Sequence, residues 1–346
     1  MKSLPSEENG ISVIVPSFQS NLEQLCRCLK SISNQIADNL NIECYVIFDG
    51  EPFKNIQHIL DIYPNFHFIT IKHSGVSIAR NEGIQHSHCR YLTFVDVDDE
   101  LPDHALKKMY DYAEQNSCDI VQGAYEAVLS TGKELHSYKK QRQLYIRNDE
   151  LMAFRKDVLH PDSGTSLVWG KLFRRSLIVE GDIEFDSDME VSEDTAFVFD
   201  ACSKAHVIGF IPDIVYRYYR STSSTVSSFR KDYEIRILNA IQHMSEHVNS
   251  FSCKNEYADS FNSYVLFHLL LVQQHFIFNK AAPWNEAERR RIYNKTIHQS
   301  IFKNALKLVS YRDFPLVKRI ALFSLKKKMY SFSKLISYIR YIQFII

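Results

Sequence analysis

Glycine and proline are scarce in this chain, with ten and nine residues among 346. So few turn residues argue against disorder and against a turn-rich all-β fold. Acidic and basic residues balance at 41 each, so the overall charge predicts no particular partner. The sequence also lacks any run of 18 apolar residues, so we expect no membrane-spanning helix.

Paired cysteine motifs are also missing. The seven cysteines are odd in number, are scattered along the chain and include no CxxC pair. This pattern argues against a disulfide framework and against a zinc site. It favours reduced, mostly buried thiols in a cytoplasmic protein.

The composition that is present is that of a globular protein. Hydrophobic residues make up 45% and charged residues 24%, and the length favours two domains. Apolar runs and helical periods alternate through the first half, which predicts an α/β fold with a mostly parallel sheet. Beyond residue 230 only long helical periods occur. We therefore predict domains at 1–230 and 231–346, the second entirely helical.

The periodicity assigns most of the chain to elements. Predicted strands span 11–16, 42–48, 66–71, 91–95, 119–128 and 207–219. Residues 168–173 form a short apolar run. Predicted helices span 21–35, 53–63, 77–86, 102–115, 196–201, 233–248, 257–278, 286–308 and 316–345. The pattern places a hairpin turn at 130–132, and it assigns no element to 133–159.

One apolar run, 91–95, ends in the carboxylates Asp96, Asp98 and Asp99. Carboxyl ends of strands in open α/β sheets are where ligands bind. Asp96 and Asp98 point the same way on an extended chain, and two carboxylates so close repel unless a cation or proton lies between them. The run therefore predicts a divalent-metal site, with a solvated acidic turn as the alternative.

Polar residues also follow the other predicted strands of the first half. They are Pro16-Ser17, Asp49-Gly50 and Lys72-His73. Because parallel strands end at one edge of the sheet, we expect these residues to converge there, where nucleotides bind.

Five motifs in order resemble those of the family 2 inverting glycosyltransferases, which have the GT-A fold and use nucleotide sugars. The similarity spans roughly residues 10–228. Its motifs are the opening strand Ile11–Pro16, the second strand Val46–Gly50, the H-S-G-V-S-I-A-R-N-E-G segment His73–Gly83, the DxD motif Asp96–Asp99 and the Glu-Asp motif Glu193–Phe197. One departure is Phe48, which stands where the family has the first acid of Asp-Asp-Gly.

The resemblance implies roles for the acidic run. We assign Asp98 as the direct ligand of Mn²⁺ or Mg²⁺, because these ions prefer oxygen ligands and share their shell with phosphate. The family implies that Asp96 faces the ribose or shares the metal, and that Asp99 lies near the donor sugar. The alternative for Asp99 is a helix N-cap.

The resemblance also implies nucleotide contacts. Asp49 would accept the imide N–H of uracil, or else form only an Asp-Gly turn. Pro16 and Phe18 would form a wall of the site that binds the base. The alternative is that Pro16 only ends its strand and Phe18 only packs in the core. Arg80 would contact the diphosphate, and Asn81 would orient the loop. The alternative for Arg80 is that it is simply a solvated or paired residue of its helix.

The family places its catalytic base at Asp194, held by Glu193. A carboxylate there would take the proton of the acceptor hydroxyl as the new bond forms. The alternative is that both acids stabilise a helix N-terminus. Trp169 could stack on a sugar or lie in the core. Arg217, Arg220 and Ser223 could close over the diphosphate.

The last 33 residues carry seven positive charges and no acid, with apolar residues between them. We expect residues 314–346 to form a basic amphipathic tail that contacts an anionic membrane face. The alternative is a helix packed on its own domain. Nothing else in the sequence supports nucleic-acid binding.

Together these features predict a metal-dependent glycosyltransferase that moves a sugar from a uridine diphosphate donor to a hydroxyl of a surface glycan, of capsule, lipopolysaccharide or teichoic acid type. Two alternatives are a haloacid-dehalogenase-type phosphatase using Asp96 and Asp98, and a non-catalytic sugar-nucleotide scaffold. The phosphatase would require its Asp-x-Asp near the N-terminus, whereas three predicted strands precede Asp96.

Overall fold

The computed structural model describes residues 8–36, 40–52, 56–129, 132–160, 163–219, 229–251, 253–309 and 314–345. It contains two compact units. The first comprises 1–158, 164–188 and 193–219, and the second comprises 159–163, 189–192 and 220–346. The short segments 159–163 and 189–192, which interrupt the first unit in sequence, belong to the second unit.

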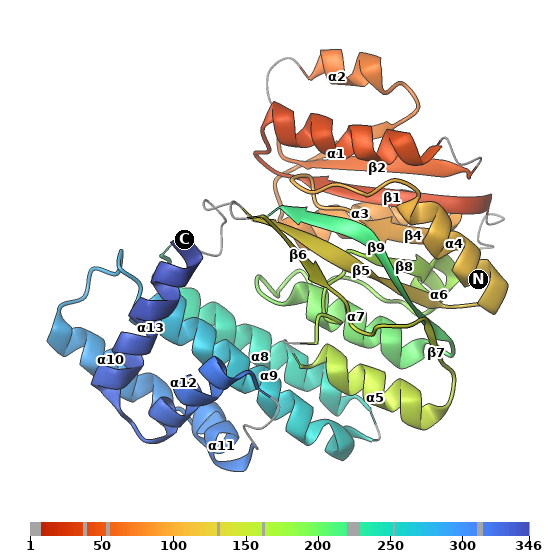
Figure 1. Ribbon diagram of the computed structural model, residues 1–346. Coiled ribbons are helices and arrows are strands. Elements are labelled where there is room, and N and C mark those ends of the chain that lie inside the picture. The colour runs from red at the N-terminus through yellow and green to blue at the C-terminus, as the bar shows by residue number, and fades with distance from the viewer. Residues whose placement is uncertain are drawn as a thin grey trace. The chain divides into compact units, whose positions relative to one another are not determined.

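The first unit begins with four strands that alternate with helices, as predicted (Figure 1). These elements are β1 (Glu8–Ser17), α1 (Leu22–Gln35), β2 (Ile42–Asp49), α2 (Gln57–Ile62), β3 (His67–Ile71), α3 (Val76–His86), β4 (Cys89–Phe94) and α4 (Ala105–Asn116). Asn21 caps α1 as predicted, and its side chain accepts the backbone N–H of Gln24 at 2.8 Å.

The remainder of the first unit contains more strands than the sequence predicted. Its elements are β5 (Ile120–Leu129), β6 (Gly132–His136), β7 (Gln143–Tyr145), α5 (Asn148–Val158), β8 (Lys171–Arg174), α6 (Arg175–Glu180), α7 (Glu193–Lys204) and β9 (Ile208–Tyr219). Three of them, β6, β7 and α5, fill the region that the pattern left unassigned. Residues 130 and 131 of the predicted turn lie outside the described residues.

The nine strands of the described residues form one sheet in the order β3-β2-β1-β4-β8-β5-β9-β7, with β6 paired to β5. The pairs β3-β2, β2-β1 and β1-β4 are parallel, and so is β5-β9. The short strand β8 is antiparallel to both of its neighbours, β4 and β5. After β3 the chain crosses back to place β4 on the other side of β1. This reversal is the switch point at which α/β sheets bind ligands.

Helices cover both faces of the sheet. On one face, Val13 of β1 and Val46 of β2 share a core with Leu29 of α1 and Met109 of α4. On the other face, Ala79 of α3 packs with Ile47 of β2. Here α3 lies so close to β1 that a Cβ at Gly83 would stand 2.3 Å from Ile14 Cγ2. Glycine at 83 therefore sets how near α3 lies to the sheet.

The second unit is built of helices. They are α8 (Tyr233–Asn249), the 3-10 helix η3 (Lys254–Tyr257), α9 (Ala258–Leu271), the π-helix η4 (Val272–Ile277), α10 (Glu286–His298), α11 (Ser300–Leu308), α12 (Leu316–Lys326) and α13 (Tyr330–Ile345). Each of two predicted long helices is divided into two helices in the structure. The helix predicted at 286–308 breaks at Gln299, and the one predicted at 316–345 breaks between Lys326 and Tyr330. Among the described residues, no helix is both long and apolar enough to span a bilayer.

Candidate functional site

The two acidic motifs meet at one buried guanidinium. Arg80, on α3, is 3% exposed. Its Nη1 lies 2.6 Å from Asp194 Oδ1 and 3.2 Å from Glu193 Oε1, and its Nη2 lies 3.1 Å from Asp96 Oδ1. Three acidic residues, which follow Arg80 by 16, 113 and 114 positions in the sequence, therefore share its positive charge.

Charge and burial act against each other in this cluster. Burial raises the pKa of Asp194, and Glu193 raises it further, to about 7, although Arg80 opposes the shift. Burial would lower the pKa of Arg80, but Asp194, Asp96 and Glu193 together raise it above its ordinary value. Asp194 is thus a carboxyl group that titrates near neutral pH, which suits a general base.

The DxD run lies at the end of β4, as expected. Asp98 is partly exposed, and burial together with the charge of Asp96 raises its pKa. Arg27 of α1 donates to the backbone carbonyl of Asp98 and so fixes this turn. Within the described residues no cluster of three or more metal-ligating side chains occurs. The pair Asp96 and Asp98 nevertheless fits a divalent ion that takes its remaining ligands from phosphate and water, because a cation there would relieve their repulsion.

Asp99 is bound to residues of β9. It is fully buried, and its carboxylate accepts the hydroxyl of Tyr216 at 2.8 Å and the backbone N–H of Tyr219 at 2.7 Å. The N-cap of α4 is His104, so the helix-cap alternative is wrong. Both carboxylate oxygens accept hydrogen bonds, so Asp99 anchors β9 to the DxD turn. Its contact with the donor sugar stays a prediction.

Asp49 organises the loop before α3. Its Oδ1 accepts the N–H of Ser74 at 2.6 Å, and its Oδ2 accepts the N–H of Gly75 at 2.9 Å and contacts His73 Nδ1 at 2.9 Å. Gly75 has a φ of +98°, which favours glycine, and this turn aims its N–H at the carboxylate. Phe48, the departure from the family pattern, is a core residue stacked on Phe68.

A small cavity of about 160 Å³ opens beside this loop. Its lining includes Pro16, Phe18, Asp49 and His73. The ring of Phe18 is 48% exposed and stacks on His73, with centroids 4.2 Å apart and planes 8° apart. The structure therefore brings together three predicted base-contacting residues, Pro16, Phe18 and Asp49, in a cavity with an exposed aromatic wall.

Asn81 holds a distant segment in place. Its side-chain amide donates to the carbonyl of Phe185 at 2.9 Å and accepts the N–H of Phe185 at 2.8 Å. This paired contact ties α3 to the segment that leads toward α7. The predicted loop-orienting role of Asn81 thus has a geometric basis.

Four further residues were predicted to contact the donor, and two of them lie among the described residues. Trp169 is 7% exposed and stacks on Tyr216 with centroids 4.4 Å apart, so it occupies the core position that was the alternative to sugar stacking. Arg217 pairs with Glu100 at 2.6 Å and Glu126 at 3.3 Å. Arg220 lies outside the described residues, as does Ser223.

Sequence reasoning missed three residues of this region. His73 was expected at the converging edge of the sheet but was given no role, and in the structure it both contacts Asp49 and stacks on Phe18. Tyr216 accepts the N–H of Asp96 at 3.0 Å while it donates to Asp99. Arg27 contacts the DxD turn from α1. Only His73 carried a signal in the sequence, because it follows a predicted strand of the converging edge.

Comparison with known proteins gives a match to one family. Residues 12–178 match the model of Glycosyl transferase family 2. A poly(ribitol-phosphate) beta-glucosyltransferase of Bacillus spizizenii is 28% identical over 217 residues, which are 60% of this chain and 32% of that protein. The poly(ribitol-phosphate) beta-N-acetylglucosaminyltransferase TarP of Staphylococcus aureus is 26% identical over 214 residues, 60% of this chain and 62% of TarP. The chain therefore matches about a third of one relative and under two thirds of the other.

A solved structure covers more of the chain. The crystal structure of S. aureus TarS 1–349 in complex with UDP-GlcNAc aligns with a TM-score of 0.63 and 18% identity, over 95% of this chain and 90% of that one. At this identity the likeness concerns the fold. It confirms the predicted fold class, a mixed and mostly parallel sheet followed by a helical region.

Proposed function

We propose that this chain is a family 2 glycosyltransferase and that it transfers a sugar, with inversion, from a UDP-sugar to a hydroxyl of a surface-glycan acceptor. The match of residues 12–178 to the model of Glycosyl transferase family 2 and the GT-A fold support this proposal. The observation that carries this proposal is the Arg80 cluster. It joins the first acid of the DxD motif to both acids of the Glu-Asp motif, at the carboxyl edge of the parallel strands. A donor-binding group and a proton acceptor thus lie in one cluster.

Asp194 would act as the general base. Its carboxylate takes the proton of the acceptor hydroxyl while the hydroxyl oxygen bonds to the anomeric carbon. The bond from that carbon to the diphosphate oxygen breaks, and UDP leaves with the electron pair. Because attack comes opposite the leaving group, the anomeric configuration inverts. Glu193 and Arg80 would hold Asp194 in place.

The cavity at Phe18 would bind the uracil base. A carboxylate has about four acceptor positions, and three on Asp49 are taken by Ser74, Gly75 and His73. The remaining position, on Oδ1, suits the imide N–H of uracil. The TarS complex with UDP-GlcNAc supports a uridine donor in this fold.

Asp98, with Asp96, would hold Mn²⁺ or Mg²⁺. Such an ion supplies Lewis-acid stabilisation of the charge that develops on the leaving diphosphate. Two oxygen ligands from the protein suit an ion that shares its shell with phosphates.

Of the three predicted acceptor classes, capsule, lipopolysaccharide and teichoic acid, the acceptor would be a phosphate-containing surface glycan of the teichoic acid type. The names of the two poly(ribitol-phosphate) transferases support this choice. Such an enzyme would take part in cell-envelope polysaccharide synthesis.

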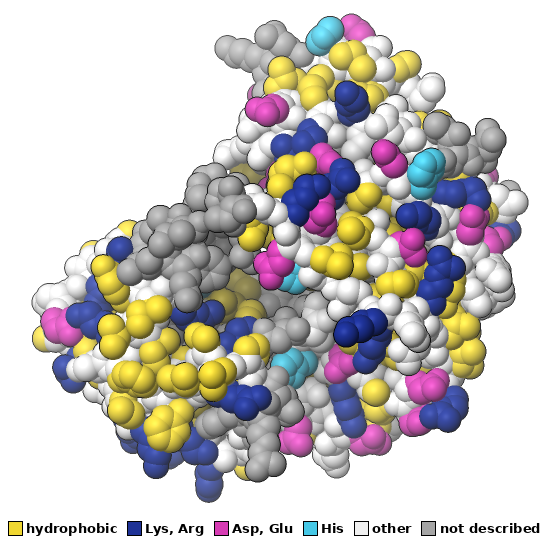
Figure 2. Space-filling view, viewed as in Figure 1, with side chains coloured by type: hydrophobic (Ala, Val, Ile, Leu, Met, Phe, Trp, Pro, Cys, Tyr) yellow, Lys and Arg dark blue, Asp and Glu magenta, His cyan; other side chains and the backbone are white. Residues whose placement is uncertain are grey.

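We also propose peripheral contact between the tail and the inner face of the cell membrane, in a cytoplasmic protein. Apolar side chains on α12 and α13 remain exposed, including Leu316 at 69% and Phe323 at 48%. Figure 2 shows hydrophobic side chains gathered on the surface where Figure 1 places α12, with Lys and Arg along their border. The opposite face of α12 is buried through Leu322 and Leu325, so the helix packs on its own unit and still presents an apolar, basic face.

The two earlier alternatives are not retained. A haloacid-dehalogenase-type phosphatase has its Asp-x-Asp after the first strand, whereas here β1, β2 and β3 precede Asp96. The match of residues 12–178 to a transferase family, with both acidic motifs present, favours the enzyme over the non-catalytic scaffold.

The proposal is tested by turnover of a panel of UDP-sugars with a poly(ribitol phosphate) acceptor. We expect Asp194→Asn to lower kcat by about 10²–10⁴-fold with little change in the Kd for UDP, because only proton transfer is lost. Asp61→Asn, which alters an exposed carboxylate on α2, is the matched control and should keep full activity. Full activity of Asp194→Asn, or turnover unaffected by a metal chelator, would contradict the mechanism.

A further inference from the structure

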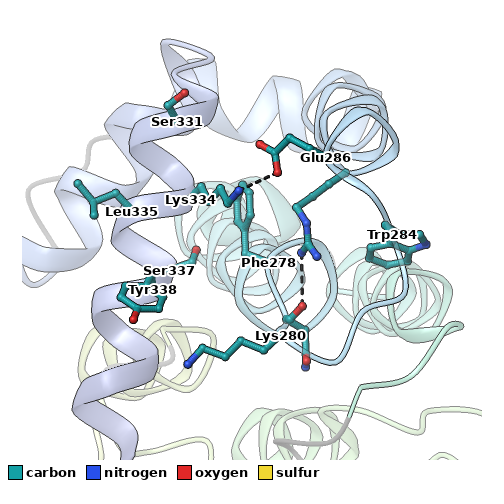
Figure 3. Close-up of a pocket in the computed structure, with 11 residues that line it drawn as sticks. Phe278, Lys280, Trp284, Glu286, Ser331, Lys334, Leu335, Ser337 and Tyr338 are labelled. Atoms are coloured by element: carbon teal, nitrogen blue, oxygen red, sulfur yellow. Dashed lines mark hydrogen bonds and ion pairs between the residues drawn. The ribbon is translucent and has the colours of Figure 1, made fainter.

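The second unit contains a larger cavity than the one beside Phe18. It has a volume of about 520 Å³, within the range of roughly 300–1,000 Å³ found for small-molecule sites. The segment between η4 and α10 forms one side, and α13 forms the other (Figure 3). No step of the proposed transfer reaction uses this cavity.

Aromatic rings stand on opposite sides of the cavity. Trp284 is held by edge contacts with Phe276, at 4.6 Å, and Phe229, at 5.2 Å between centroids. Tyr338 of α13 is 53% exposed, and Lys280 Nζ lies 5.1 Å from its ring centroid. Figure 3 shows Tyr338 on α13 with Trp284 across from it. Such rings give a flat apolar surface to the C–H faces of a sugar or polyol.

The charges around the cavity are mostly positive. Lys280, Arg289 and Lys334 line it, and Glu286 is the single acid among its lining residues. Lys334 Nζ lies 2.7 Å from Glu286 Oε2 (Figure 3). Arg289 donates to the backbone carbonyls of Ile277 and Asn279. Arg and Lys with this excess of charge suit a phosphate group.

We propose that this cavity binds a polyol-phosphate segment of the acceptor chain, with the polyol between Trp284 and Tyr338 and the phosphate near Lys280, Arg289 and Lys334. The proposal rests on the proposed function for the identity of the acceptor. A second contact of this kind would raise the local concentration of acceptor units around the enzyme. It would therefore favour long acceptors over single units.

Binding of a short poly(ribitol phosphate) oligomer to the full chain, measured by isothermal titration calorimetry without donor or metal, tests the site. We expect Lys280→Ala with Lys334→Ala to weaken the Kd about tenfold or more, since charge-assisted hydrogen bonds are lost. The matched control is Lys303→Ala with Lys307→Ala, which removes two exposed lysines from α11. It should bind as the wild type does.

The aromatic wall has its own test. Tyr338→Ala should weaken oligomer binding severalfold, whereas Tyr338→Phe should retain it, because the ring and not the hydroxyl makes the contact. The side chain is exposed, so both variants should keep the thermal unfolding temperature of the wild type.

Three results would overturn the proposal. The first is that the double variant of Lys280 and Lys334 binds the oligomer as the wild type does. The second is that the α11 control loses as much affinity as that variant. The third is that UDP displaces the oligomer from the protein. Vesicles of phosphatidylglycerol carry the same polyol-phosphate group, and if they bind at the cavity while the oligomer does not, the assignment to the acceptor is wrong. Because no donor is present, failure of the transfer reaction would not affect this measurement.

Discussion

At the scale of single residues, Arg80 has the largest expected effect on stability. It is buried against three carboxylates, so its removal leaves unpaired charges in a poorly solvated place. We expect Arg80→Met to lower the free energy of unfolding by about 3 kcal/mol, as measured by urea denaturation. Arg80→Lys should lie between this variant and the wild type, because Lys keeps the charge but lacks the forked geometry.

A surface arginine provides the comparison for Arg80. Arg90 pairs with Glu114, and both side chains are about one-third exposed. Arg90→Met should cost no more than about 1 kcal/mol. Equal losses at the two positions would mean that the Arg80 cluster contributes no more than an ordinary surface pair.

The pH dependence of the reaction should follow Asp194. Burial raises the pKa of this carboxyl to about 7, so below that pH it is protonated and cannot accept a proton. We expect kcat/KM to rise about tenfold per pH unit below pH 7 and to level off above it. An initial-rate series from pH 5.5 to about 8.5 measures this, and a flat profile would be evidence against Asp194 as the base.

Much of the residue-level site was visible in the sequence, but partners across the sheet were not. The positions of Asp96, Asp98, Asp49 and Asp194 follow from strand ends and ordered motifs. That Asp99 binds Tyr216 could not be predicted, because 117 positions separate the two and no local pattern encodes their pairing.

At the scale of elements, α3 is the helix that positions the site. It carries Arg80 and Asn81, and Gly83 sets its distance from β1. We expect Gly83→Ala to cost about 1–3 kcal/mol of stability and to lower kcat, because the methyl group would push α3 away from Ile14. Gln85→Ala, at an exposed position of the same helix, should change neither property. Urea denaturation and initial rates measure the two effects, and a fully active, stable Gly83→Ala would show that the contact relaxes.

The order of strands and helices was predictable where periods were long and regular, as from β1 to α4. The short strand β8 was expected only as an apolar run, and its insertion between β4 and β5 depends on long-range pairing. The region of β6, β7 and α5 was left unassigned because its residues are mostly polar. The single helix expected at 286–308 breaks at Gln299, whose φ of −58° and ψ of 135° are not helical.

At the scale of the whole molecule, we expect the tail to give measurable membrane affinity. The protein should sediment with vesicles that contain anionic lipid, and less of it should do so as salt is raised, because screening weakens the attraction. Leu316→Asn with Phe323→Asn should lower the bound fraction severalfold, since each side chain loses apolar burial in the lipid interface.

Exposed apolar residues away from the tail give the matched control for the membrane test. Leu135 on β6 is 61% exposed and Ile235 on α8 is 69% exposed. Their change to Asn should leave vesicle binding as it is in the wild type. If the control lowers binding as much as the tail variant does, general hydrophobicity and not the tail is responsible.

The shared cation at Arg80 has a consequence for the order of events on the ribosome. Asp96 follows Arg80 by 16 positions, whereas Glu193 follows it by 113. At about 5–20 residues per second, translation supplies the pair Glu193 and Asp194 roughly 5–20 s after Asp96. During that interval the nascent chain holds α3 and the DxD strand with Arg80 only partly neutralised. The emergence of α7 is therefore the step at which translation completes the cluster.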